Sequence, residues 1–186
     1  MKQLIKLFLG IIITSIALSC HERTEKIGGK ISFQLDEQGP LASSADTLEI
    51  SNLLDSLNVA AAHADFNKYF SFFAEDATYN GTDATENWSK KTFMAWAKPY
   101  FEGKTTWHFK SVKRNIFFGS HDDIAWFEEL LSTPMKICRG SGIVVKRNNK
   151  WKIQQYVLSM TVPNSKLDKV VELKTADEDA LLQRYK

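Results

Sequence analysis

The stretch IAWFEELLSTPMKICRGSGIVVKRNNKWKIQQYVLSMTV, residues 124–162, decides the fold that we expect for this chain. Apolar and polar side chains alternate along it, which is typical of β-strands that bury one face. Two turn signals, Thr133-Pro134 and Asn148-Asn149, divide it into strands at 124–132, 136–147 and 151–162. Turns this short join antiparallel neighbours, so we predict a meander. A strand at 106–118, followed by Ser120-His121-Asp122, adds a fourth member.

The residues before this sheet favour helices. Asp46 and Glu49 have the N-cap and N3 positions of a capping box, and apolar residues follow at helical spacing from Ile50 to Ala64. We expect a second short helix with the aromatic residues Phe66, Tyr69, Phe70 and Phe73. An extended stretch at 77–79 and a loop at 81–88 should precede a third helix, capped by Ser89 and kinked or ended by Pro99. Three helices followed by a long antiparallel sheet indicate an α+β domain with the helices against one face.

The N-terminus has the pattern of an export signal. Lys2 and Lys6 precede an apolar run that resumes at Ile16 and stops at Ser19-Cys20, too short to span a bilayer. The end of this run resembles the bacterial lipobox, so we predict a signal peptide at 1–19, lipidation of Cys20 and a location in the cell envelope. The alternative is ordinary cleavage near Ser19, which would leave a free thiol. Residues 20–45 are polar and aperiodic, and we interpret them as a flexible linker.

Charge and cysteine content narrow the possible partners. The formal net charge of +2 includes Lys2 and Lys6, so removing the signal leaves 22 basic and 22 acidic residues. Nucleic-acid binding therefore has no electrostatic support. Cys138 would be the only cysteine besides the lipidated one, and we expect it to be buried. We assign residues 46–164 to one domain and 165–186 to a C-terminal helical tail.

Several motifs resemble the nuclear transport factor 2-like superfamily, and more closely its SnoaL-like branch. They are ADF at 64–66, GTDATE at 81–86, KPYF at 98–101, AWFEE at 125–129, CRGSG at 138–142 and WKI at 151–153. The resemblance implies a cone in which a curved antiparallel sheet wraps the N-terminal helices and leaves a ligand-sized cavity at its wide end. It does not imply one activity, because the superfamily includes isomerases, dehydratases, cyclases, hydrolases and non-catalytic binding domains.

Strand pairing sorts the side chains of the sheet into two rows. With Thr133-Pro134 as a two-residue turn, Glu128 faces Arg139 and Glu129 faces Cys138. With Asn148-Asn149 as the next turn, Ser141 faces Tyr156 and Gly142 faces Gln155. The first row then holds Trp126, Glu128, Arg139, Ser141 and Tyr156, and the second holds Phe127, Glu129, Gly140, Gly142, Gln155 and Val157. We expect the second row to face inward.

The candidate catalytic residues are two acids, Glu129 and Asp83. A carboxylate inside an apolar cone would have a raised pKa and could act as a general base. The alternative is that Glu128 and Arg139 form a surface pair while Glu129 hydrogen-bonds to the backbone, and that Asp83 satisfies turn donors. The candidate ligand-binding residues are His63, Glu86, Trp88, Trp96, Tyr100, Trp126, Arg139, Gln155 and Tyr156. We predict no metal site and no cofactor, because the histidines lack ligand spacing.

Three functions remain open at this stage. The first is an envelope-tethered domain that binds a small, largely apolar ligand, because the aromatic-rich domain lacks a recognisable catalytic set. The second is a cofactor-independent isomerase, dehydratase or hydrolase with a cavity carboxylate as its base. The third is an assembly domain that forms a homodimer through its sheet face.

Overall fold

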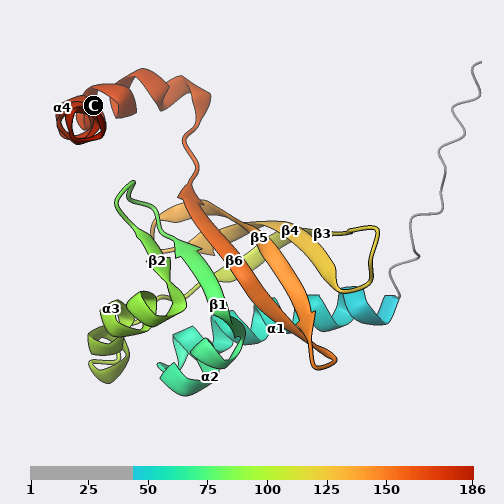
Figure 1. Cartoon of the computed structure of the whole chain (residues 1–186). Helices are drawn as coiled ribbons and strands as arrows, with labels where there is room; N and C mark the ends of the chain where they lie inside the picture. Colours follow the sequence, from blue (N-terminus) through green and yellow to red (C-terminus); the bar gives the residue numbers. More distant parts are fainter. Residues whose placement is uncertain (1–43) are drawn as a thin grey trace, which may run out of the picture. The chain divides into compact units, whose positions relative to one another are not determined.

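The computed structural model describes residues 44–186, and the predicted signal peptide, Cys20 and most of the linker lie outside them. The helices are α1 (Ser44–Ala62), α2 (Phe66–Ser71), α3 (Lys90–Glu102) and α4 (Leu167–Leu182), with short 3-10 helices η1 (Asn164–Lys166) and η2 (Gln183–Tyr185). The strands are β1 (Phe73–Asn80), β2 (Asn87–Ser89), β3 (Lys110–Phe118), β4 (Ile124–Thr133), β5 (Lys136–Arg147) and β6 (Lys150–Met160). Figure 1 shows α1, α2 and α3 on one side of the sheet, as the predicted α+β arrangement requires.

The six strands form one sheet in the order β2-β1-β6-β5-β4-β3. The predicted antiparallel meander is confirmed for β3 to β6. The sheet as a whole is mixed, because β1 pairs with β6 in parallel and β2 pairs antiparallel with β1 at the edge. The prediction of a sheet with only antiparallel neighbours was therefore wrong. Parallel neighbours have no tight turn between them, so no local signal in the sequence marks this contact.

Three helix boundaries differ from the predicted ones. Asp46 is not an N-cap but lies in the first turn of α1, where its carboxylate accepts hydrogen bonds from Lys146 Nζ at 2.7 Å and Trp151 Nε1 at 2.8 Å. Phe73 begins β1 instead of ending α2. Pro99 does not end α3, which continues to Glu102, and the Pro99 carbonyl accepts the Gly103 N–H at 2.9 Å. The predicted cap of α3 is confirmed, with Ser89 Oγ accepting the Thr92 N–H at 3.2 Å.

The first hairpin register is shifted by two residues from the predicted one. Thr133 pairs with Lys136, so the turn residues are Pro134 and Met135. Glu129 consequently lies opposite Gly140, and Glu128 lies opposite Ser141. A shift of two keeps every side chain on its predicted face, because the side-chain period of a strand is two. The inward orientation of Phe127 and Glu129 is confirmed, since both are buried.

A β-bulge changes the faces of β6. The Asn148-Asn149 turn is confirmed, and pairing runs as expected to Val144 opposite Ile153. The register then shifts, so that Tyr156 lies opposite Gly142 and Gln155 lies opposite Ile143. Tyr156 therefore joins the inner row and Gln155 the outer row, the reverse of the predicted arrangement. The extra residue of a bulge exchanges the two faces of the strand beyond it.

The core fills the space between the helices and the inner face of the sheet. Its largest fully buried side chains are Phe93, Phe127, Ile50, Leu54, Leu131, Ile153, Val144 and Cys138. Cys138 is a free thiol and buried, as predicted. The main contacts of α4 are with η1 and η2, and none of its residues is buried. Within residues 44–186 no helix is long and apolar enough to cross a bilayer.

Candidate ligand-binding cavity

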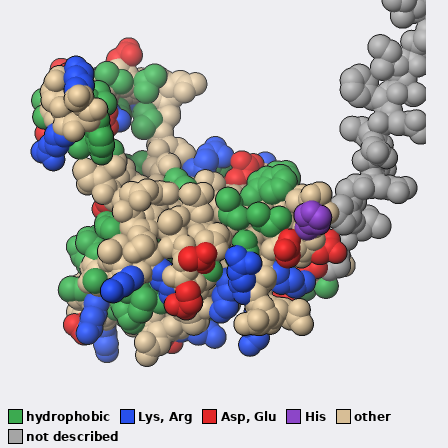
Figure 2. Space-filling view, viewed as in Figure 1, with side chains coloured by type: hydrophobic (Ala, Val, Ile, Leu, Met, Phe, Trp, Pro, Cys, Tyr) green, Lys and Arg blue, Asp and Glu red, His purple; other side chains and the backbone are tan. Residues whose placement is uncertain are grey.

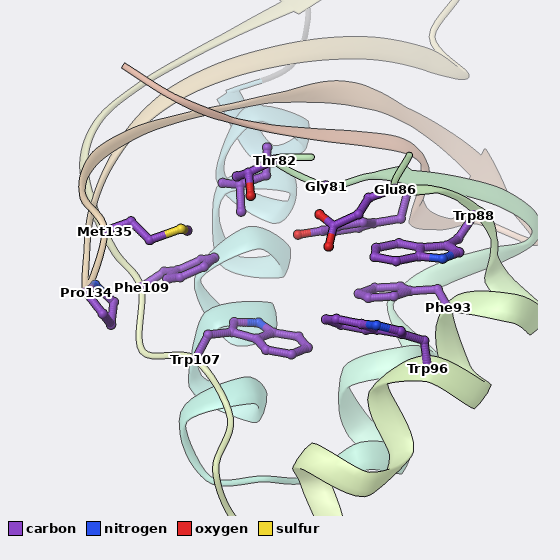
Figure 3. A pocket seen from close by; sticks show the side chains of 12 residues that line it. Gly81, Thr82, Glu86, Trp88, Phe93, Trp96, Trp107, Phe109, Pro134 and Met135 are labelled. Carbon is purple, nitrogen blue, oxygen red and sulfur yellow. The ribbon is translucent and has the colours of Figure 1, made fainter. Parts of the chain in front are cut away.

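A cavity of about 270 Å³ opens between β1, β2, α3, the segment before β3 and the β4–β5 turn. Figure 3 shows its lining, which comprises Tyr79, Gly81, Thr82, Glu86, Trp88, Phe93, Trp96, Trp107, Phe109, Pro134, Met135 and Leu158. Apart from Gly81, Thr82 and Glu86, these side chains are aromatic or aliphatic. An apolar hollow with a few polar groups is typical of small-molecule sites.

Stacked aromatic rings form one wall of the cavity. The centroid of Phe93 lies 4.1 Å from that of Tyr79 and 5.5 Å from that of Trp88. Trp88 in turn stacks on Trp96 with centroids 4.7 Å apart. Phe93 and Trp96 are three positions apart in α3, so both side chains lie on the helix face that meets the edge of the sheet. Trp107 contributes a further ring across the opening, 6.4 Å from Trp96.

The loop between β1 and β2 brings a carboxylate to this wall. Gly81 N–H donates to the Glu86 carbonyl at 2.9 Å, which closes the loop, and Asp83 N–H donates to Glu86 Oε2 at 3.2 Å. A Cβ on Gly81 would collide with Glu86 Oε2, so the glycine leaves room for the carboxylate. Glu86 is the only Asp, Glu, Lys, Arg or His among the lining residues.

The phenol of Tyr79 is held neutral beside this carboxylate. Burial raises the pKa of Tyr79 well above its ordinary value, and the charge of Glu86 raises it further. Tyr79 also stacks on Tyr156 with centroids 5.5 Å apart. The floor of the cavity is therefore an uncharged aromatic surface.

Glu129 lies outside this cavity, in a separate polar network. Its Oε2 pairs with Arg114 at 2.8 Å, and its Oε1 accepts the Tyr156 hydroxyl at 3.1 Å. Arg114 also bonds to Asp55 and to the Ser51 carbonyl of α1. Burial lowers the pKa of Arg114, but Asp55 and Glu129 outweigh burial and raise it.

The prediction that Glu129 serves as a base in the cavity does not fit this position, because both oxygens already have partners. The alternative, a bond from Glu129 to the backbone, was wrong, since its partners are side chains.

Asp83 is a loop-forming residue that does not line the cavity. Its carboxylate is exposed and accepts hydrogen bonds from the hydroxyl and backbone N–H of Thr85, which lower the pKa of Asp83. This geometry agrees with the alternative prediction, in which Asp83 accepts hydrogen bonds from donors of its own turn. Glu128 and Arg139 form the expected surface pair, 3.7 Å apart on the outer face.

The other predicted ligand-binding residues are spread over several surfaces. Glu86, Trp88 and Trp96 line the cavity, and Tyr100 packs against Trp96 beside it. His63 is exposed in the turn that follows α1 and does not line the cavity. The outer face of the sheet carries Trp126, Arg139 and Gln155, while Tyr156 is buried under the cavity wall with its hydroxyl on Glu129.

Sequence reasoning missed most of the lining. Tyr79 was expected only as part of the extended stretch at 77–79, and Met135 lies outside the expected turn pair Thr133-Pro134. Trp107 and Phe109 alternate just before β3, a signal for a common face that could have been used. Within residues 44–186 no group of three His, Cys, Asp or Glu side chains is arranged to hold a metal ion.

The sequence and the fold are both similar to those of known proteins. The sequence model described as "SnoaL-like domain" matches residues 50–163. No curated protein matches the chain. One similar structure is an NTF2-like protein of unknown function from Pseudomonas putida KT2440, with 14% identity, a TM-score of 0.56, and 66% of this chain and 92% of that chain covered.

Two further structures share the fold at low sequence identity. A domain of unknown function with a cystatin-like fold from Nostoc punctiforme PCC 73102 has 13% identity and a TM-score of 0.56, covering 76% of this chain and 99% of its own. The association domain of C. elegans CaMKII has 18% identity and a TM-score of 0.52, covering 62% of this chain and 96% of its own. The order of elements, the mixed curved sheet and the family match agree. This chain belongs to the SnoaL-like domain family and has the NTF2-like fold.

Proposed function

We propose that this domain binds a small, largely apolar ligand in the cavity walled by Trp88, Phe93 and Trp96. The observation that carries the proposal is a hollow of about 270 Å³ whose lining is mostly aromatic and aliphatic. Burying an apolar molecule there would release water from these rings, which is the main source of affinity in such sites. The enzyme hypothesis has less support, because neither Glu129 nor Asp83 lines the cavity.

The proposal includes a tether at the cell envelope. It rests on the apolar run before Ser19-Cys20, which lies outside the described residues. A lipid on Cys20 would hold the binding domain near the membrane on a linker of about 25 residues. Radiolabelled palmitate should label the wild-type protein and not a Cys20→Ala variant. Equal labelling of both would contradict the tether and leave the binding proposal untouched.

Binding is testable with the neutral fluorescent probe N-phenyl-1-naphthylamine. We expect saturable fluorescence with the purified protein and at least a tenfold weaker Kd for Trp96→Ala, because a stacked indole contributes about 1.5 kcal/mol or more by burial. Trp96 is 39% exposed, so its removal should leave the fold intact.

Trp126→Ala is the matched control for this experiment. Trp126 is similarly exposed, at 46%, and stacks on Phe117 on the outer face of the sheet, away from the cavity. Background from lipid or detergent is the same for both variants. Equal binding by the two variants, or no saturable signal with wild-type protein, would contradict the proposal.

The outer face of the sheet supports a second candidate function, self-association. Phe117 and Trp126 stack there with centroids 5.8 Å apart and with exposures of 42% and 46%. Figure 2 shows hydrophobic side chains gathered over this part of the sheet. A contiguous apolar patch of this kind favours a symmetric dimer. Light scattering at micromolar concentration should give the dimer mass for wild-type protein and the monomer mass for Trp126→Glu, and a wild-type monomer would contradict it.

A further inference from the structure

We propose that the cavity selects ligands carrying a cationic nitrogen, an ammonium or quaternary ammonium group beside an apolar body, with Glu86 as its charge partner. This inference rests on the proposed function, since it specifies the chemistry of the ligand that the same cavity binds. It starts from the character of the lining, in which Glu86 is the only acidic or basic side chain.

Among the residues that the structure describes, the Glu86 carboxylate has no cationic partner. The ion pairs among residues 44–186 join Glu75, Asp55, Glu129 and other acids to Lys or Arg, and none of them includes Glu86. The nearest basic residue in sequence, Lys90, is turned to Glu75 at 2.8 Å and to the Phe73 carbonyl at 3.2 Å. The one hydrogen bond that Glu86 Oε2 accepts comes from an uncharged amide, Asp83 N–H. A cation entering the cavity would therefore supply the missing counter-charge.

The aromatic wall provides the second half of cation recognition. The negative face of an indole ring attracts a cation within about 6 Å of its centroid, and tryptophan does so better than other rings. Three tryptophans, Trp88, Trp96 and Trp107, border the cavity. Figure 3 shows the Glu86 carboxylate pointing into the space that these rings border. A cationic group there would contact a carboxylate and ring faces together, whereas an anion would meet repulsion from both.

The loop also holds Glu86 in place before any ligand arrives. Three hydrogen bonds fix it: Gly81 N–H donates to the Glu86 carbonyl, Glu86 N–H donates to the Asp83 carbonyl, and Asp83 N–H donates to Glu86 Oε2. Gly81 also leaves the space that the carboxylate occupies. Pre-organised charge costs little reorganisation on binding, so it favours selectivity as well as affinity. The hydroxyl-bearing side chains of the lining, Thr82 and Tyr79, are uncharged and do not offset this preference.

The test compares two molecules of one shape, phenyltrimethylammonium and tert-butylbenzene, as competitors of bound N-phenyl-1-naphthylamine. We expect wild-type protein to bind the cation about tenfold more tightly than the neutral isostere. Glu86→Gln keeps the acceptor for Asp83 N–H and removes the charge, so the cation should lose about tenfold in affinity while the isostere changes less than twofold. Probe binding by the same variant shows that its cavity is intact.

Glu49→Gln is the matched control, because Glu49 is exposed on α1 and does not line the cavity. It should leave the preference for the cation unchanged. Equal affinities of the two competitors for wild-type protein, or a Glu86→Gln variant that still prefers the cation tenfold, would overturn this inference while the binding proposal stands. Failure of both the probe and tert-butylbenzene to bind would overturn the binding proposal itself.

Discussion

Two carboxylates, Glu129 and Glu86, show how different the same side chain is in two regions of this domain. Glu129 is 1% exposed and has Arg114 and Tyr156 as partners, so its negative charge is compensated inside the protein. Glu86 is partly exposed at the cavity, and its Oε2 accepts one backbone N–H. Burial alone therefore does not identify a functional acid. The acid that we propose for ligand binding is Glu86, whose charge has no cationic partner among residues 44–186.

The largest expected effect comes from removing the compensated carboxylate. Glu129→Ala leaves the Arg114 guanidinium, 9% exposed, with Asp55 as its remaining carboxylate, and leaves the Tyr156 hydroxyl without an acceptor. We expect a loss of about 3 to 5 kcal/mol in the free energy of unfolding, measured by urea denaturation. Glu128→Ala, on the outer face of the same strand, should cost less than about 1 kcal/mol. Similar losses for both variants would contradict the structural role of Glu129.

A smaller loss is expected from crowding the same network. A Cβ on Gly140 would collide with the Tyr156 hydroxyl and lie 3.1 Å from Glu129 Cγ. Gly140→Ala should therefore destabilise by about 1 to 3 kcal/mol, because these buried groups have no free space to move into. Ser141→Ala, next in the strand and directed to the outer face, should change the free energy of unfolding by less than about 0.5 kcal/mol. A neutral Gly140→Ala variant would show that the network is looser than its packing indicates.

Alkaline pH should weaken the same region through its tyrosines. Burial raises the pKa of Tyr156, and the charge of Glu129 raises it further, while burial is also the main cause for Tyr69 and Tyr79. Each folded pKa exceeds the unfolded value near 10, so the unfolded chain ionises first and stability is lost as pH rises above about 10.

We expect unfolding free energy measured against pH to be level up to about pH 9.5 and then to fall. In Tyr156→Phe the loss between pH 9.5 and 11 should be smaller by about 1 kcal/mol, because one raised phenol is absent. An identical pH dependence for the variant and the wild-type protein would contradict this assignment.

The smallest effect on stability is expected from a substitution at Gly81, beside the Glu86 carboxylate that lines the cavity. Gly81→Ala would displace Glu86, but this loop is largely exposed, so the free energy of unfolding should fall by less than about 1 kcal/mol. The preference for phenyltrimethylammonium over tert-butylbenzene should nevertheless fall severalfold. An unchanged preference would show that the position of Glu86 does not depend on Gly81. Gly140→Ala should have the opposite profile, a stability loss with little change in selectivity.

The sheet was predictable where its signals are local. Alternation located β4 to β6 within a few residues, and Asn148-Asn149 identified one turn correctly. The two-residue error at Thr133-Pro134 kept every side chain on its face, so Phe127 and Glu129 were still assigned inward. The one-residue register shift between Ile143 and Val144 does exchange the two faces of the strand. Tyr156 and Gln155 were therefore assigned to the wrong faces of the sheet.

The cavity was predictable only in part, because its lining comes from segments that are distant in the sequence. Trp88 and Trp96 were expected from their aromatic character, and Glu86 from the loop composition. Glu129 was a catalytic candidate because it was expected on the inner face of the sheet, and that face is confirmed. Its partner Arg114 stands 15 residues earlier and pairs through the β3–β4 register, which periodicity does not reveal.

The sequence by itself determined the family, the succession of three helices and a meander, and the inward face of β4, because these depend on neighbours within a few positions. Tertiary structure alone decided the parallel contact of β1 with β6, the exchange of faces beyond the bulge and the different fates of the two acids. Those features depend on which distant groups meet, Arg114 with Glu129 and aromatic rings with Glu86. Glu129 and Glu86 are the same type of side chain, but Glu129 has a cationic partner in Arg114, whereas the Glu86 carboxylate accepts a hydrogen bond from an uncharged amide. The tertiary contacts of each glutamate therefore determine whether its charge is paired within the described part of the chain.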